Sequence, residues 1–200
     1  MSPLEMIGLA LGSSFASGLN LYATVSVLGL LHRFQVVELP PGLEILSHPL
    51  VLGIAIAMYV IEFVADKVPY VDNVWDVVHT FVRPPAAAIL AYAALADIPE
   101  SLRIVAALLA GGVALTSHGA KASTRAAANV SPEPFSNSIL SLGEDVVAVS
   151  VTWVALTHPL ITIAVVIVLV GTALYLIVKF LRFVWQILRR IFSRQPEPFQ

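Results

Sequence analysis

The chain has 200 residues, of which 58% are hydrophobic and 12% charged, and its formal net charge is -2. A soluble domain typically carries about 25% charged residues, so this chain is too apolar to cover a water-facing surface. The small net charge with scattered basic residues does not indicate nucleic-acid binding, and the lack of cysteine excludes disulfides and thiolate metal sites.

Six apolar segments predict an all-α fold, a polytopic membrane helix bundle forming a single domain over residues 1–180. A helix needs about 20 apolar residues to cross the hydrocarbon core of a bilayer. The segments are Leu4–Leu31, Pro49–Ala65, Val74–Ala96, Leu102–Ala120, Ile139–Leu156 and Leu160–Phe180. The first lacks the basic start and cleavage site of a signal peptide, so we expect it to remain as a helix.

The first segment carries polar side chains on one helical face, spaced 4, 3 and 4 residues apart: Ser13, Ser17, Asn20 and Thr24. Gly18 and Asn20 near its middle predict a locally unwound helix that lines a site. The alternative is close packing between helices through small residues, helped by Gly8 and Gly12.

The second segment ends with Glu62 and Asp66, which are four residues apart and therefore on one face. Two like charges at this spacing repel each other, so they need a cation, a proton or water between them. Solvation at the membrane interface is the alternative. With Asp72 and Asp76, these residues are weak candidates for a metal site.

The third segment shows the clearest pattern, four ionisable residues on one face: Asp72, Asp76, His79 and Arg83. Pro84-Pro85 follows, and a proline inside a helix removes a backbone hydrogen bond and bends the helix. This face predicts a binding site, or else a buried structural ion pair of Arg83 with Asp76 or Glu144.

The fourth segment places His118, Lys121 and Arg125 on one face, which favours an anion site. A hydrogen-bonded structural role is the alternative for His118. The long side chains of Lys121 and Arg125 are also able to extend to the membrane surface.

The fifth segment begins near Asn137 and carries Glu144 and Asp145 within an apolar run. Charged groups at this depth are costly, so we expect both carboxylates to be protonated or paired with Arg83, Lys121 or Arg125. The sixth segment has almost no polar residue before Lys179 and is predicted to face lipid.

Basic residues gather at one set of segment ends: Lys67, Lys121, Arg125, Lys179, Arg182, Arg189, Arg190 and Arg194. The opposite set has only Arg33 and Arg103, so an even number of crossings predicts both termini in the cytoplasm. Residues 181–200 mix basic and large apolar residues and predict an interfacial helix end or a stop-transfer anchor, followed by a disordered tail.

A weak internal repeat relates Pro69–Val74 to Pro134–Ile139. It suggests two related hairpins, segments two with three and four with five, around a pseudo-two-fold axis.

Several motifs taken together resemble a family of small bacterial membrane proteins, the domain of unknown function DUF4126. They are residues 17–22 (Ser-Gly-Leu-Asn-Leu-Tyr), 66–69 (Asp-Lys-Val-Pro), 83–84 (Arg-Pro), 118–121 (His-Gly-Ala-Lys) and 131–134 (Ser-Pro-Glu-Pro). The resemblance covers about residues 5–160. It implies a multi-pass protein of the bacterial inner membrane and carries over no activity.

These patterns leave three hypotheses for function. The first is a transporter or permeation protein for a small anion or an anionic lipid headgroup, with a cytoplasm-facing cavity and a coupling proton on Glu144 or Asp145. The second is a membrane enzyme acting on a lipid phosphate, with Mg²⁺ held by the carboxylates. The third is a structural protein with an internal ion-pair network. No cofactor is expected; the bilayer is a partner, and a homo-oligomer is open.

Overall fold

The computed structural model describes residues 1–68, 70–128 and 134–192, and over these residues it is a bundle of helices without strands. The helices are α1 (Pro3–Arg33), η1 (Pro41–Ser47), α2 (Pro49–Ala65), α3 (Val71–Ala94), α4 (Glu100–Ala128), α5 (Pro134–Thr157) and α6 (Pro159–Phe192). The all-α prediction is confirmed. Arg194 and the tail at residues 195–200 lie outside the described residues, as do Pro69, residues 131–133 and the side chain of Arg190.

Five of the described helices are long and apolar enough to cross a membrane, or six if η1 and α2, which meet at 67°, count as one span. The predicted second segment coincides with α2, and η1 precedes it as a short cap. The multi-pass membrane class expected from the composition therefore holds.

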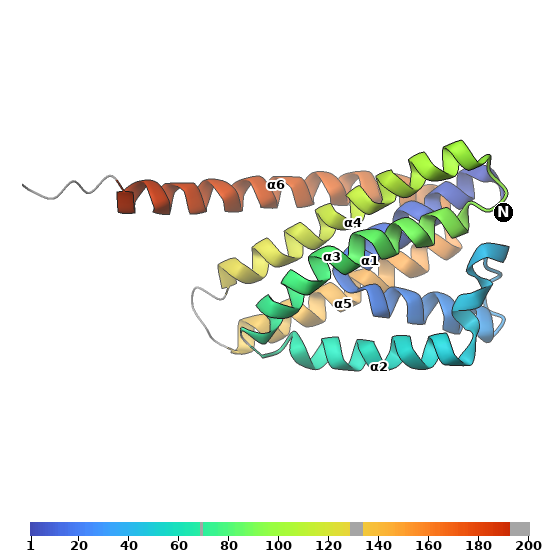
Figure 1. Cartoon of the computed structure of the whole chain (residues 1–200), viewed down its shortest axis with the longest axis horizontal. Coiled ribbons are helices and arrows are strands. Elements are labelled where there is room, and N and C mark those ends of the chain that lie inside the picture. Colours follow the sequence, from blue (N-terminus) through green and yellow to red (C-terminus); the bar gives the residue numbers. More distant parts are fainter. Residues whose placement is uncertain (69, 129–133, 193–200) are drawn as a thin grey trace, which may run out of the picture.

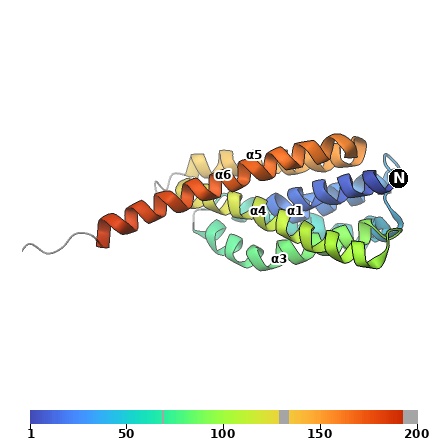
Figure 2. The same cartoon turned by 90° about the horizontal axis from the view of Figure 1, so that it is seen from above.

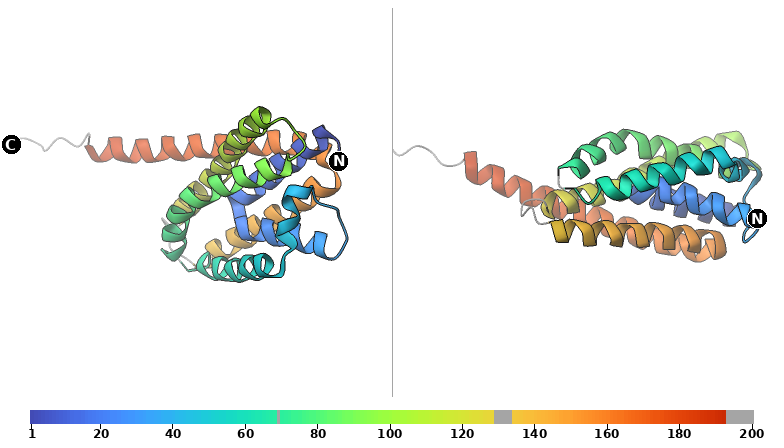
Figure 3. Two further views of the ribbon diagram at one scale, coloured as in Figure 1. Left: turned by 45° about the vertical axis from the view of Figure 1, so that its right-hand side comes forward. Right: turned by 90° about the horizontal axis from the view of Figure 1, so that it is seen from below.

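Helix α1 differs from the other long helices because it turns back on itself at Asn20. This residue has φ -150° and ψ 101°, an extended conformation inside an otherwise helical run. Gly12 of the first half and Leu31 of the second half both lie near the last turns of α5, at Ala155 and Trp153. Figures 1 and 3 show α1 entering from one end of the bundle, turning in its middle and returning to the same end.

The predicted local unwinding of the first segment is therefore confirmed. The chain also reverses its direction there, which the sequence did not indicate. The segment forms a re-entrant hairpin of two half-helices, while α2 to α6 run alternately from one end of the bundle to the other (Figure 1). Pro3 and the end of α6 lie at opposite ends of the bundle. The expectation of both termini in the cytoplasm assumed that α1 crosses, and the orientation of the termini stays a prediction.

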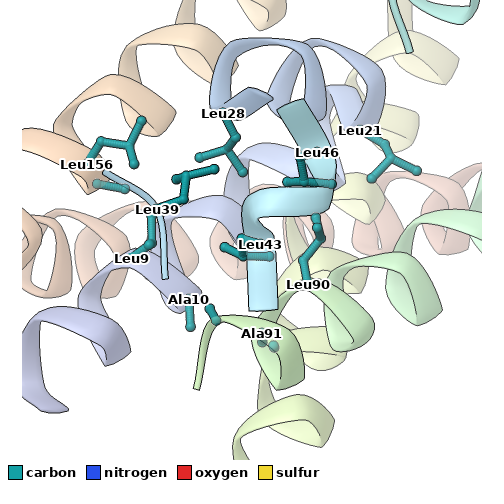
Figure 4. Close-up of a cluster of buried hydrophobic side chains, with 13 residues drawn as sticks. Leu9, Ala10, Leu21, Leu28, Leu39, Leu43, Leu46, Leu90, Ala91 and Leu156 are labelled. Atoms are coloured by element: carbon teal, nitrogen blue, oxygen red, sulfur yellow. The ribbon is translucent and has the colours of Figure 1, made fainter. Parts of the chain in front are cut away.

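The end of the bundle that holds Pro3 is apolar inside. Figure 4 shows leucines of residues 34–48 packed between the two halves of α1 and the end of α3, with Leu43 and Leu28 fully buried. Burying one such side chain stabilises a protein by about 1.5–3 kcal/mol in water. This cluster fixes both arms of the α1 hairpin and so positions its turn.

Small residues let α1 approach its neighbours closely. A Cβ added at Gly18 would collide with Ser117 and the Ala114 carbonyl on α4, and one at Gly12 would collide with Ala155 on α5. The small-residue packing considered for α1 thus exists alongside the unwound turn.

Helix α6 lies on the outside of the bundle, as expected from its lack of polar residues. Only a few of its side chains are buried, among them Thr162, Val166 and Ala173. With 34 residues it is about 51 Å long, whereas a hydrocarbon core is about 30 Å thick. Its last turns extend past the bundle in both views (Figures 1 and 2).

Candidate functional site

The half of the bundle opposite Pro3 holds a buried network of charged side chains around the turn of α1. Its cations are Arg83 of α3 and Lys121 and Arg125 of α4, with exposed fractions of 0%, 3% and 0%. Lys121 and Arg125 therefore do not extend to the membrane surface, because carboxylates from α2, α3 and α5 surround them inside the bundle.

Arg83 connects α3 to both α1 and α2. Its Nη1 donates to the carbonyl oxygen of Gly18 over 2.8 Å, and its Nη2 forms an ion pair with Glu62. The buried ion pair considered as the alternative for Arg83 exists, but its partner is Glu62 and not Asp76 or Glu144. The guanidinium points at the end of the first half of α1, where Glu62 also lies. Helix α3 continues through Pro84-Pro85 up to Ala94.

His118 is neutral in this arrangement. Arg83 Nη1 lies 2.8 Å from its Nδ1, and a guanidinium only donates hydrogen bonds, so Nδ1 is the acceptor. The imidazole proton then sits on Nε2, which lies 2.9 Å from Thr80 Oγ1 and 3.0 Å from the Asp76 carbonyl oxygen. His118 therefore adds no positive charge to the site.

Lys121 lies among three carboxylates, two from the end of α2 and one from α5. Its Nζ is 2.9 Å from Asp66, 3.4 Å from Glu62 and 3.7 Å from Glu144. It also donates to the carbonyl oxygen of Leu19 over 3.2 Å. One cation thus ties the turn of α1 to α2, α4 and α5.

Arg125 forms the second part of the network near the end of α4. It contacts Asp66 over 3.0 Å, Asp72 over 3.8 Å, and Glu144 through Nε over 3.1 Å. Burial raises the pKa of Asp66, which follows α2, but Lys121 and Arg125 outweigh it and hold the pKa below its ordinary value. Asp66 is therefore ionised.

The turn of α1 is capped on both sides. Asn20 Oδ1 accepts a hydrogen bond from the backbone N–H of Ala23 over 2.9 Å, as an N-cap does for the second half-helix. Its Nδ2 donates to Asp145 over 2.8 Å. The first half-helix ends at Gly18 and Leu19, whose carbonyls receive Arg83 and Lys121, in agreement with the negative end of a helix dipole.

Acidic groups exceed basic groups in this network as far as the structure describes it. Glu62, Asp66, Asp72, Asp76, Glu144 and Asp145 stand against Arg83, Lys121 and Arg125. Four of these acids have buried oxygens with no hydrogen-bond partner in the described chain: Asp76 (both oxygens), Glu62, Asp66 and Asp145. Unpaired buried carboxylate oxygens are costly, so the site has unused capacity for a proton or a cation.

The remaining predicted residues also lie at this end of the bundle. His79 Nε2 is 3.2 Å from the hydroxyl of Tyr22, and the Ser17 side chain is fully buried. Asn137 donates to Asp72 over 3.1 Å. Asp72 and Asn137 hold equivalent positions in the suggested repeat, and their contact agrees with a two-fold axis between them; the repeat itself stays a prediction.

Tyr22 and Thr80 belong to the site but were not predicted from the sequence. For Thr80 a signal was present, because it lies one helical turn after Asp76. Glu62 and Asp66 were expected to need a cation, a proton or water, and they are the main partners of the buried cations. Within the described ranges, no cluster of three or more His, Cys, Asp or Glu side chains is placed to hold a metal ion.

A groove of about 450 Å³ leads from the outer surface to this network. Its lining comes from α1, α4, α5 and α6 and is mostly apolar, with Ile139, Val147 and Leu176 exposed at its sides. Lys121 and Glu144 are the charged residues in its lining, and Leu19 of the α1 turn lies beside them.

These features define a class: a polytopic helical membrane protein in which a re-entrant hairpin meets a buried charge network. The chain belongs to the family described as Domain of unknown function (DUF4126), whose model matches residues 7–179. The resemblance drawn from the motifs is thereby confirmed. No curated protein and no solved structure matches the chain.

Proposed function

We propose that this protein is a permeation protein of the transporter class that moves protons through the buried network at the turn of α1. The observation that carries the proposal is the excess of buried carboxylates, with unpartnered oxygens, around two half-helices that end in the middle of the bundle. Broken helices at mid-depth are typical of ion sites in transporters, and buried acids there are typical of proton relays.

The net negative charge of the buried network favours a proton or a cation as the transported ion over the anion expected from the sequence. Each buried cation of the described network already contacts at least one carboxylate, and Arg83 and Lys121 also hold backbone carbonyls. An anion would have to displace these partners. A proton instead neutralises an acid that has unused acceptor oxygens, as at Asp76 and Asp145.

Lys121 offers a way to couple protonation to movement. Its ammonium group lies within reach of Glu62, Asp66 and Glu144. When one of these acids is protonated, the ammonium group is attracted more strongly to the acids that stay ionised. Glu62 and Asp66 lie at the end of α2, whereas Glu144 lies on α5. Exchange of partners would therefore shift α4 relative to α2 and α5, which is the kind of two-state element that alternating access needs.

The experiment is proton uptake by liposomes that contain the purified protein and an internal pH dye. A negative internal potential should acidify the interior faster than in protein-free vesicles. Asp76→Asn and Asp145→Asn should reduce uptake toward the protein-free rate, because each keeps the side-chain shape and removes the titrating group. Asp97→Asn, which changes an exposed carboxylate beyond α3, is the matched control and should leave uptake unchanged.

The structural hypothesis gives a different result in the same experiment. If the network only stabilises the fold, wild-type protein moves no protons at any potential, and the proposal is overturned. In the enzyme hypothesis His79, Arg83 and His118 would serve as base and phosphate ligands. The geometry does not favour this, because Glu62 binds Arg83 and the free nitrogen lone pair of His118 accepts from Arg83.

We also propose that the network end of the bundle faces the cytoplasm of a bacterial inner membrane. The end of α2, which Lys67 follows, and the last turns of α6 lie toward this end (Figure 1). Those turns of α6 carry the exposed Lys179, Arg182 and Arg189. Arg33 ends α1 and Arg103 lies in the first turn of α4, at the other end. A positive-inside orientation then places Pro3 on the outer side.

A further inference from the structure

The groove between α4, α5 and α6 reaches the charge network from the apolar surface of the bundle. The residues at its sides, Ile139, Val147 and Leu176, are apolar and exposed, and they lie on helices long enough to span a membrane. The groove therefore opens toward lipid and not toward water. A molecule dissolved in the bilayer enters it directly. The volume of about 450 Å³ lies within the range of small-molecule sites, roughly 300–1,000 Å³.

The charges at the inner end of the groove select the sign of its occupant. Glu144 is the charged side chain of the lining that keeps some exposure, 13% of its side chain, whereas Lys121 keeps 1%. Lys121 is also turned inward to Asp66 and the Leu19 carbonyl. Arg125 already holds Glu144 from inside the bundle, so a ligand head in the groove meets the exposed part of this paired carboxylate. The network behind it has more acids than bases, so an added positive charge meets a net negative one.

We propose that this groove binds an amphipathic organic cation, with its apolar body between α4, α5 and α6 and its positive group beside Glu144. The proposal rests on the proposed function and names the substrate class of the same site. A cation at Glu144 reduces the net negative charge of the network, as a proton does. Binding of either one therefore weakens binding of the other. A phospholipid chain filling the groove is the competing occupant.

Gly143 gives a direct way to block the groove. It lines the groove on α5, and a Cβ built there meets no atom within 4 Å, so a larger side chain enters open space without a clash. Gly112 of α4 is equally exposed and equally open, but it does not line the groove. Gly143→Trp and Gly112→Trp are therefore a matched pair of test and control.

The experiment measures binding of tetraphenylphosphonium to purified protein in phospholipid nanodiscs by equilibrium dialysis. Tetraphenylborate, which has the same shape and the opposite charge, is the second probe. We expect the phosphonium to bind the wild type and the Gly112→Trp variant equally, and Gly143→Trp and Glu144→Gln to bind it about tenfold more weakly or worse. The borate should not bind above protein-free nanodiscs.

Each result decides the proposal. Equal binding of both probes means that the groove selects no charge and holds apolar groups such as a lipid chain, which overturns the inference. Equal phosphonium binding by Gly143→Trp and Gly112→Trp means that the cation does not bind in the groove, which also overturns it. No phosphonium binding with normal proton uptake overturns the inference and leaves the proposed function standing. Phosphonium binding by a protein that moves no protons supports the groove and overturns the proposed function.

Discussion

Arg83 shows how much one buried side chain does in this site. Its guanidinium reaches the Gly18 carbonyl, the His118 ring and Glu62 at once, from α3 to α1, α4 and α2. A lysine at this position has one nitrogen and lacks the planar, forked geometry that makes these contacts together.

We therefore expect Arg83→Lys to destabilise the protein by about 3 kcal/mol, although the charge is kept, because partners of a buried ion pair are left unsatisfied. Thermal unfolding in detergent measures the change. Arg182→Lys, on the exposed part of α6, is the control and should unfold like the wild type. Similar unfolding temperatures for both variants would contradict the role of the forked contact.

Asp66 gives a prediction for pH. Burial raises its pKa, but Lys121 and Arg125 lower it to below the ordinary value, so the folded protein holds this proton less tightly than the unfolded chain. The resulting stability is present above the unfolded pKa of about 3.9 and is lost as the pH falls through the folded pKa.

We accordingly expect wild-type protein to lose stability as the pH is lowered below about 4, while Asp66→Asn is less stable at neutral pH and depends less on acid in this range. Unfolding temperatures measured across the pH range test this. The control is Asp97→Asn, which should follow the wild-type curve; a curve for Asp66→Asn parallel to the wild type would exclude the assignment.

Helical spacing was sufficient to predict the faces of the site. Asp76, His79 and Arg83 share a side of α3 because residues three and four apart always do, whatever surrounds the helix. The partners were not predictable in the same way. Arg83 pairs with Glu62 because the end of α2 packs beside the turn of α1, and that packing depends on contacts distant in sequence.

At the scale of elements, the hairpin of α1 is the feature on which the site depends. Its turn is a single extended residue whose side chain caps one half-helix and contacts α5. We expect Asn20→Ala to remove proton uptake and to destabilise the fold by about 2–4 kcal/mol, the cost of a lost N-cap plus that of leaving buried Asp145 without its donor.

Uptake and unfolding measured on the same preparation separate these two effects. Ser26→Ala is the control, since Ser26 is buried in the same half-helix and its hydroxyl makes no hydrogen bond that it would lose. An Asn20→Ala protein with normal uptake would show that the turn does not belong to the permeation path.

The turn was only partly predictable from the sequence. The run Gly18-Leu19-Asn20 indicated an unwound helix, and the segment Leu4–Leu31 was longer than the roughly 20 residues a span needs. Its reversal in direction was not indicated, because hydropathy does not register direction. The reversal is stabilised by Arg83, Lys121 and Asp145, which come from three later helices.

At the scale of the whole molecule, the hairpin sets the topology. The sequence contains no cysteine, so a single cysteine introduced by substitution is the only site that a membrane-impermeant thiol reagent can label. We expect Glu5→Cys and Asp97→Cys to be labelled from one side of the membrane, and Lys67→Cys and Gln186→Cys from the other, because α2 to α6 alternate between the two ends (Figure 1).

Labelling of intact cells and of inverted vesicles distinguishes the sides, and solubilised protein gives the total for each position. Labelling of Glu5→Cys and Gln186→Cys from the same side would restore the even number of crossings that the basic residues first suggested, and would exclude a re-entrant α1.

The α1 hairpin also constrains how the chain is made. Its polar turn is acceptable in the membrane only when Arg83, Lys121 and Asp145 are present, and all three are synthesised after it. We expect the Ser14→Cys side chain to react with thiol reagents in nascent chains that stop before α5, and to become protected only in longer ones. The segment that leaves the ribosome first would then be among the last to reach its final place, so completed assembly of α2 to α5 acts as a checkpoint before the ion path can exist.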